Sequence, residues 1–312
     1  MNKYINNLFS ILEKSYLVIV ALALAFGLLF PEKAYILTPF STLFLQIIFF
    51  LTSLKIDARK ILKDVAGNIY SLIIINVFML LLLPAVIFFA AQYTIPYLAL
   101  PLLLLAAMPS GMTTPLLTEV VGGKTSLALV LTLTTSLLAP LTIPLVMVLF
   151  AKTTVIVSAA TMVWSLTKVI LIPFILAQVV RYLGYSRFKY TFFTFKPISI
   201  ILLGLLIAGA VADQAYVITN NLGAQTLIQL GVLFLFTIVV LAIGYFTLYK
   251  KDYKEKITIA VSLAFMNFTL AIYIAINFFN DPVVLLSSVL IIFPWALMLT
   301  PFKLFAERFL RK

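Results

Sequence analysis

Ten long apolar runs follow one another along the chain, separated by short segments that carry charges, Pro or Gly. A helix needs about 20 mostly apolar residues to cross the hydrocarbon of a bilayer. The separating segments are too short for an extramembrane domain, so we predict an all-α polytopic membrane protein with ten transmembrane helices. The predicted spans are residues 10–30, 35–54, 69–91, 96–120, 125–150, 160–182, 197–217, 224–248, 257–279 and 283–305.

The composition excludes several classes of soluble protein. Apolar residues make up 64% of the 312 residues and charged residues 10%, whereas a soluble domain is about 45–50% apolar and about 25% charged. A soluble enzyme, a nucleic-acid-binding module and a disordered scaffold are therefore excluded. The net charge of +12 is attributed to basic loops that face lipid headgroups, so membrane lipids rather than nucleic acid are the expected partners. The absence of Cys and His excludes disulfides and most zinc sites, and no cofactor is expected.

The basic residues are distributed unevenly between the two sides that ten spans define. With a cytoplasmic N-terminus, nineteen of the 22 Lys and Arg residues lie on the cytoplasmic side. Lys33 and Lys152 lie on the other side, and Lys168 lies in or beside the sixth span. Because basic loops are retained in the cytoplasm, we predict a multi-pass protein of the cell (inner) membrane with both termini cytoplasmic.

Ten spans divide into two groups of five near Lys152. With an odd number of spans in each half, the second half enters the membrane from the opposite side, as in the inverted repeats of many secondary transporters. We therefore expect a first five-helix repeat over residues 1–152 and a second, inverted repeat over residues 153–312. The two halves show no clear similarity residue by residue.

The fourth span contains a segment that is unfavourable for a continuous helix. Pro109, Gly111 and Pro115 lie within eight residues of one another, and Pro both lacks an N–H and clashes with the preceding turn. One interpretation is a kinked but continuous helix. The other is two half-helices that meet near the midplane, where irregular backbone survives only beside protein or water. Thr113 and Thr114 would then cap the second half-helix or direct hydroxyls toward a ligand.

The ninth span has no comparable signal. Residues 262–269 contain neither Gly nor Pro, so residue physics alone does not predict an interruption there. Asn267 in this span, and Asn76 in the third, either bond to a neighbouring helix or contact a ligand.

Several segments together resemble the bile acid:sodium symporter family, within the larger group that also holds auxin-efflux-type carriers. The resemblance covers most of the chain and is best over Met108–Val146. Its motifs are Pro109–Thr114, the Thr-rich Thr132–Pro140, Phe50–Lys55, Leu171–Leu176 and the pair Met266-Asn267.

The resemblance implies two inverted five-helix repeats, with discontinuous helices 4 and 9 crossing in a core domain beside a separate panel domain. It implies secondary active transport of a small organic anion, bile-acid-like or another carboxylate, by elevator-type alternating access that is usually driven by sodium. The substrate-binding positions would be Pro109, Ser110, Gly111, Thr113, Thr114, Pro115 and Asn267.

The positions that would bind sodium depart from the family pattern. They fall on Thr114, Pro115, Ala128, Thr132, Ser262 and Met266. Ser262 replaces the usual Glu, Pro115 an Asn, Ala128 a Ser and Met266 a Gln. Hard cations favour oxygen ligands, and a negative ligand offsets the cost of burying the ion. The hydroxyls of Thr114, Thr132 and Ser262 would form only a neutral site, so we expect sodium binding to be weak or lost.

Two ionisable residues near the bilayer have alternative interpretations. Glu119 lies close to the inner end of the fourth span, where it is either an interfacial group or a proton-linked replacement for the missing carboxylate. Lys168 is either a mid-membrane counter-ion for an anionic substrate or, if Val155–Trp164 is an interfacial helix, a residue that extends to the interface. The second interpretation of Lys168 is favoured.

Other functions remain as alternatives. A sodium-independent facilitator or a proton-coupled carrier is compatible with the same scaffold. A membrane-embedded enzyme is less favoured, because the chain has no His and its acids occur without a paired-carboxylate motif. A receptor or structural role would leave the interrupted fourth helix without a purpose. The sequence does not indicate an oligomeric state.

Overall fold

The computed structural model describes residues 16–54, 56–57, 69–151, 158–188, 192–213, 215–221, 223–247, 252–279 and 281–310. Within these ranges all elements are helical, and the only isolated β-bridge joins Ser110 to Met266. The predicted all-α class is therefore confirmed. Six helices are long and apolar enough to cross a membrane: Pro31–Ser53, Ile69–Thr94, Thr125–Phe150, Ala159–Leu183, Ala224–Thr247 and Pro282–Arg308.

The other four predicted spans contain shorter helices. The first holds α2 (Tyr16–Leu29), and the seventh holds most of α13 (Phe192–Asp213). The fourth and ninth are each divided into two helices, described below. The chain is thus a multi-pass helical membrane protein, and the full count of ten spans remains a prediction.

The chain forms two compact units, each built from two separate segments. Unit 1 comprises Met1–Ala58 and Ser165–Leu222, and unit 2 comprises Arg59–Trp164 and Gly223–Lys312. Each unit therefore combines one segment from each half of the chain. The predicted division between residues 152 and 153 lies outside the described residues, as do the basic residues of the 58–68 and 248–251 loops.

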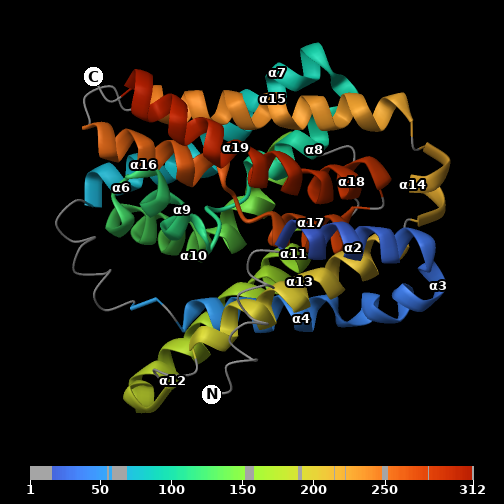
Figure 1. Cartoon of the computed structure of the whole chain (residues 1–312), viewed down its shortest axis with the longest axis horizontal. Coiled ribbons are helices and arrows are strands. Elements are labelled where there is room, and N and C mark those ends of the chain that lie inside the picture. The colour runs from blue at the N-terminus through green and yellow to red at the C-terminus, as the bar shows by residue number, and fades with distance from the viewer. Residues whose placement is uncertain are drawn as a thin grey trace. The chain divides into compact units, whose positions relative to one another are not determined.

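Unit 1 is organised around α13, which packs against α2 and α4 (Ser41–Ser53) (Figure 1). Its other elements are α3 (Pro31–Ala34), η1 (Tyr35–Phe40), η3 (Thr167–Leu171), α12 (Ile172–Phe188) and α14 (Ala215–Asn221). The carbonyl groups at the end of α4 have no partner within that helix. Arg181 of α12 donates to Leu54 O at 3.1 Å and pairs with Asp57 at 2.9 Å, so α12 satisfies this helix end.

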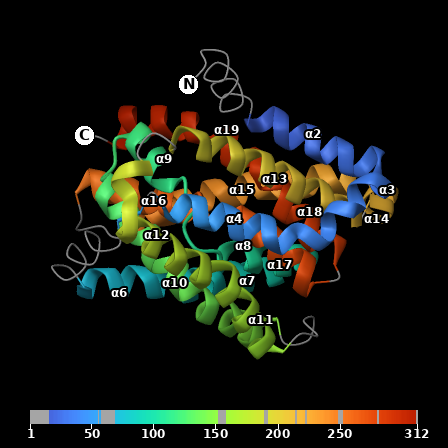
Figure 2. The ribbon, with the colours of Figure 1, turned by 90° about the horizontal axis from the view of Figure 1, so that it is seen from below.

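Unit 2 contains the divided helices together with longer helices that pack against them (Figure 2). Its elements are α6 (Ile69–Val77), η2 (Phe78–Leu82), α7 (Leu83–Thr94), α8 (Pro96–Ala106), α9 (Thr114–Val121), α10 (Thr125–Phe150), α15 (Ala224–Thr247), α16 (Tyr253–Ala264), α17 (Phe268–Phe278), α18 (Pro282–Leu290), α19 (Ile292–Phe305) and η4 (Ala306–Leu310). The first segment of this unit ends within α11 (Ala159–Leu166), because the boundary with unit 1 falls between Trp164 and Ser165.

Two proline residues are accommodated by wider, π-helical turns. Pro84 and Pro173 cannot donate to the carbonyl one turn earlier. In each case the residue before the Pro bonds five residues back, Leu83 to Phe78 O and Ile172 to Thr167 O. The helix therefore continues past the Pro with one residue inserted into its turn.

Candidate functional site

The fourth predicted span is interrupted. Helix α8 ends at Ala106 and α9 begins at Thr114, with seven non-helical residues between them. The continuous, kinked alternative is therefore wrong, and the fourth predicted span consists of two half-helices. Pro115 lies in the first turn of α9, where its missing N–H would have no intrahelical partner, so it favours this helix start.

The ninth predicted span is interrupted as well. Helix α16 ends at Ala264 and α17 begins at Phe268. The Asn267 side chain accepts a hydrogen bond from the Leu270 N–H at 3.1 Å and so caps α17. This cap is a local signal for a helix start in a segment that lacks Gly and Pro.

The two interruptions pair with each other through their backbones. The Gly111 N–H donates to Phe265 O at 2.9 Å, and the Asn267 N–H donates to Pro109 O at 2.8 Å. Ser110 and Met266 form the antiparallel bridge between these bonds. We call the two paired interruptions, residues 107–113 and 265–267, the crossover. Figure 1 shows α9 and α16 on one side of the crossover and α8 and α17 on the other. Each interruption thus satisfies polar backbone groups of the other, which hydrocarbon cannot do.

Gly111 is required by the close approach of these two segments. A Cβ atom at this position would lie 2.7 Å from Phe265 O and 3.1 Å from Met266 O. Both contacts are with backbone atoms, which cannot rotate away as a flexible side chain can. Any larger residue would separate the two segments.

Hydroxyl groups complete the hydrogen bonding of the crossover. Thr135 Oγ1 of α10 accepts from the Ser110 N–H at 3.2 Å and donates to Leu131 O at 2.6 Å. Thr132 Oγ1 lies 3.4 Å from both Ser110 Oγ and Gly111 O. Thr114 Oγ1 donates to Phe265 O at 2.9 Å. Thr132 and Thr114 were predicted site residues, whereas Thr135 was missed although it lies in the same Thr-rich stretch.

The comparison with known proteins identifies the family of the chain. The model of the sodium bile acid symporter family matches residues 42–221, which is more than half of the chain. The chain belongs to this family. No curated protein matches the chain. Members of the family are, at a coarse level, sodium-coupled transporters of bile acids and related organic anions rather than enzymes.

The family match covers only part of the crossover. It includes the interruption between α8 and α9 and the hydroxyls of α10, but it ends before Ser262 and Asn267. The assignment of the α16–α17 interruption therefore rests on the structure, through its backbone pairing with residues 109–111.

The residues present do not fit a sodium ion well. The described residues contain no group of three or more acidic, His or Cys side chains. Ser262 is fully buried and its Oγ has no hydrogen-bond partner, and Ala128 and Met266 are buried without an oxygen in their side chains. Among the described residues, the oxygen atoms at the crossover belong to hydroxyls and carbonyls, and a cation site built from them would contain no negative ligand.

The remaining predicted site residues are not gathered at the backbone pairing. Thr113 is exposed and its side chain makes no cap hydrogen bond, so its predicted capping role is wrong. Asn76 is buried in α6, where its Nδ2 donates to Leu72 O at 2.8 Å. Glu119 is exposed on α9, and Lys168 is exposed on η3 of unit 1, where its carbonyl accepts a hydrogen bond from Gln46. Residues 155–157 of the expected interfacial helix lie outside the described ranges.

Proposed function

We propose that this protein is a secondary active transporter that moves a small organic anion, bile-acid-like or another carboxylate, by elevator-type alternating access. The observation that supports this most is the pair of interrupted helices in unit 2, joined through their backbones at Ser110 and Met266. Such irregular backbone within apolar spans is costly unless it serves a site. In carriers with discontinuous helices, the substrate site lies at these interruptions.

The crossover is suited to an anionic group. Helices α9 and α17 both begin there, and helix N-termini carry partial positive charge and free N–H groups. Neither acidic nor basic side chains lie in residues 107–113 or 265–267. We propose that the substrate contacts Ser110, Gly111, Thr113, Thr114 and Asn267, with Pro109 and Pro115 fixing the shape of the backbone.

We propose further that the chain consists of ten transmembrane helices in two inverted repeats, residues 1–152 and 153–312. Unit 2, which carries the crossover, would be the core domain that moves the substrate, and unit 1 would be the panel domain. The charge distribution supports insertion in the cell membrane with both termini cytoplasmic.

Sodium coupling is expected to be weak or lost in this member of the family. The neutral donors Thr114, Thr132 and Ser262 support this expectation, because no carboxylate accompanies them. The alternative carriers on this fold are a sodium-independent facilitator and a proton-coupled carrier. A role for Glu119 in proton coupling would be indicated by loss of proton-driven uptake in Glu119→Gln and excluded by full retention.

The test begins with a thermal-shift screen of organic acids, because a ligand that binds only the folded protein raises its stability. Anions that raise the melting temperature are then used in uptake assays with proteoliposomes, in sodium and in choline media. Saturable uptake that is nearly equal in the two media is expected. A steep, sigmoidal dependence on sodium would contradict weak coupling, and no uptake of any stabilising anion would contradict the carrier itself.

A further inference from the structure

Helices α9 and α16 of unit 2 are joined at both of their ends. At the crossover, Thr114 Oγ1 of α9 donates to Phe265 O just beyond α16. At the other end, α9 stops at Gly122, which has a left-handed φ of 80°, and the Lys124 N–H donates to Thr258 Oγ1 of α16 at 2.7 Å. The two helices therefore pack as an antiparallel pair, with α9 leading away from the crossover and α16 leading toward it.

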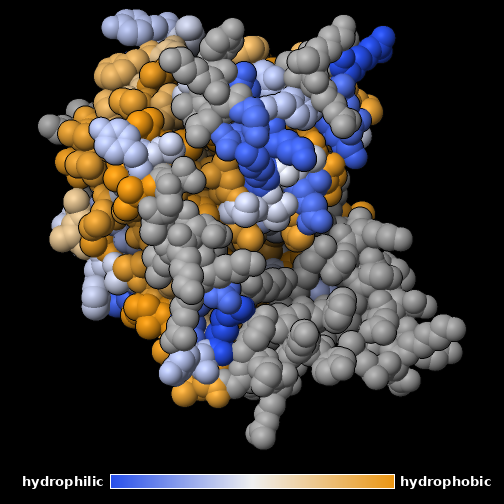
Figure 3. Space-filling view, turned by 90° about the vertical axis from the view of Figure 1, so that its left-hand side faces the viewer, coloured by the Kyte–Doolittle hydropathy of each residue, from blue (hydrophilic) through white to orange (hydrophobic). Residues whose placement is uncertain are grey.

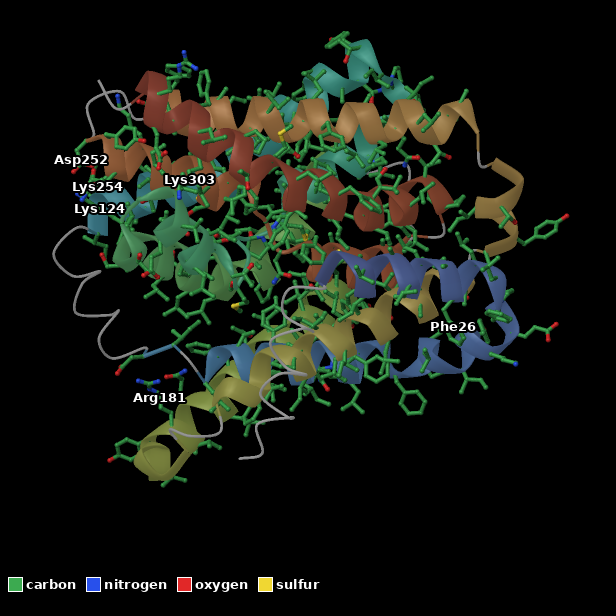
Figure 4. The ribbon with its side chains drawn as sticks, in the orientation of Figure 1. Phe26, Lys124, Arg181, Asp252, Lys254 and Lys303 are labelled. Atoms are coloured by element: carbon green, nitrogen blue, oxygen red, sulfur yellow. The ribbon has the colours of Figure 1, made fainter. Side chains whose placement is uncertain are left out.

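An ion-pair cluster closes the end of this pair that is remote from the crossover. We call Lys124, Asp252 and Glu255 the Lys124 cluster. Lys124 Nζ lies 2.8 Å from Asp252 Oδ2 and 2.9 Å from Glu255 Oε1. Figure 4 shows Lys124 and Asp252 close together beside Lys254, and Figure 3 shows hydrophilic side chains gathered on this side of the molecule. The cluster connects the turn after α9 to the first turn of α16.

Asp252 has a second role in the same cluster. Its other oxygen, Oδ1, accepts the Glu255 N–H at 2.7 Å and caps α16. The hydrogen bonds from Lys124 and from this N–H hold the pKa of the Asp252 carboxyl below its usual value. The bonds to Asp252 and Glu255 likewise raise the pKa of Lys124. Both shifts favour the charged forms of Asp252 and Lys124.

Between these two ends, the interface of α9 and α16 contains buried hydroxyls. A Cβ atom on Gly123 would lie 2.6 Å from Thr118 Cγ2 and 2.8 Å from Thr258 Oγ1, so both of these side chains lie close to Gly123. Thr258 and Ser262 are four residues apart in α16, which places their side chains on one face of this helix. Because Thr258 Oγ1 accepts from the Lys124 N–H just beyond α9, we place Ser262 on the α9 side of α16 as well.

Two of these hydroxyls have no hydrogen-bond partner. Thr118 and Ser262 are both 0% exposed, and neither oxygen is paired. Burying an unpaired hydroxyl is unfavourable, so these groups would be stabilised by a hydrogen bond to water or by coordinating a small cation. The Lys124 cluster is itself solvent-exposed, with 36% of the Lys124 side chain and 55% of the Asp252 side chain accessible. Such surface ion pairs hold an interface only weakly.

We propose that the Lys124 cluster is a latch that holds the α9–α16 interface closed, and that its release admits water and small cations to Thr118 and Ser262 on the way to the crossover. Lys124 is then a positioning residue for this access route. The proposal concerns access along one interface of unit 2, so it does not depend on which substrate is carried.

The chain has no Cys, which allows a direct test in the full-length protein. Ser262→Cys introduces a single thiol, and its reaction with 2-(trimethylammonium)ethyl methanethiosulfonate is followed by mass spectrometry. We expect slow modification in the otherwise unchanged protein. Adding Lys124→Gln should accelerate it about tenfold, because the rate follows the open fraction and two charge-assisted bonds are lost. Lys124→Arg should keep the rate slow.

Two controls distinguish opening of the α9–α16 interface from a general destabilisation of the fold. Lys254→Gln removes one exposed positive charge beside the cluster and leaves its three members in place, so it should change the modification rate much less than Lys124→Gln. Ser288→Cys places a thiol at a fully buried position of α18 whose hydroxyl bonds within its own helix, and its rate should not respond to Lys124→Gln. Thr118→Cys repeats the measurement from α9. The proposal would be overturned if Lys124→Gln left the thiol modification rates of both Ser262→Cys and Thr118→Cys unchanged. It would also be overturned if Lys124→Gln accelerated modification of Ser288→Cys equally.

Discussion

At the scale of single residues, the crossover depends on small and polar side chains that contact residues distant from them in sequence. Gly111 and Phe265 are separated by more than 150 residues, yet a Cβ on Gly111 would collide with the Phe265 carbonyl. The motifs in any one segment of the sequence cannot show such a contact. Pro109, Gly111 and Pro115 do show that a helix is unfavourable there, and that part of the site was predictable.

Gly111→Ala is expected to destabilise unit 2 by about 1–3 kcal/mol, because overpacking against backbone forces the crossover segments apart. The measurement is thermal unfolding of the purified protein in detergent. Gly231→Ala is the matched control, since nothing lies within 4 Å of a Cβ at this position of α15. Because Ala is favoured over Gly in a helix, the control should be neutral or slightly stabilising. Equal melting temperatures for the two variants would contradict the assigned contact.

The charge of Asp252 is expected to stabilise the fold in a defined pH range. Its pKa is lowered in the folded state, so its contribution is present above the unfolded value of about 3.9 and is lost as the pH falls through the lower folded value. Asp252→Asn keeps a cap for α16 but removes the charge that faces Lys124, Lys254 and Glu255. The melting-temperature difference between wild type and Asp252→Asn should stay constant from about pH 6 to about pH 8 and shrink below about pH 4. A difference that changes between pH 6 and pH 8 would contradict this assignment.

At the scale of helices, the apolar runs predicted most elements, because span length and hydropathy follow from the bilayer itself. The interruption between α8 and α9 was predictable from Pro and Gly. The interruption between α16 and α17 was not predictable from residue physics, because residues 265–267 leave the helix to pair with residues 109–111, which are distant in sequence. Its one local signal is Asn267, and a capping Asn looks in sequence like any Asn within a span.

Thr135 is expected to hold the crossover through its hydroxyl, since it accepts the Ser110 N–H from α10. Thr135→Val keeps the shape but leaves that N–H unpaired, which should cost about 1–3 kcal/mol. Thr135→Ser keeps the hydroxyl and should restore most of the stability. Thr142→Val on the same helix is the control, because the Thr142 hydroxyl bonds only one turn back to Leu138 O at 3.2 Å. Equal effects of Thr135→Val and Thr142→Val in thermal unfolding would exclude this role.

At the scale of the whole molecule, the two units each combine segments from both halves of the chain. Neither run lengths nor charges indicate which helices pack together, so this organisation was beyond the sequence-based prediction of two consecutive repeats. The sidedness of the loops, in contrast, is a prediction that follows from the basic residues alone.

The predicted sidedness can be measured with single thiols in the Cys-free chain. Lys33→Cys and Lys254→Cys place one thiol each at exposed positions that the charge distribution assigns to opposite sides of the membrane. A membrane-impermeant maleimide added to intact cells should label position 33, and position 254 only after permeabilisation. Labelling of both positions in intact cells would contradict the assigned topology.

The most direct test of the central claim, that the paired interruptions form the transport site, is uptake of a stabilising organic anion into proteoliposomes. Wild type, Gly111→Ala and Gly231→Ala are compared at a temperature at which all three are folded. Saturable uptake by wild type and Gly231→Ala, with a loss of at least about tenfold in Gly111→Ala, is the result expected from a crossover that must keep its geometry to bind substrate. Unchanged uptake by Gly111→Ala would show that the substrate is carried elsewhere.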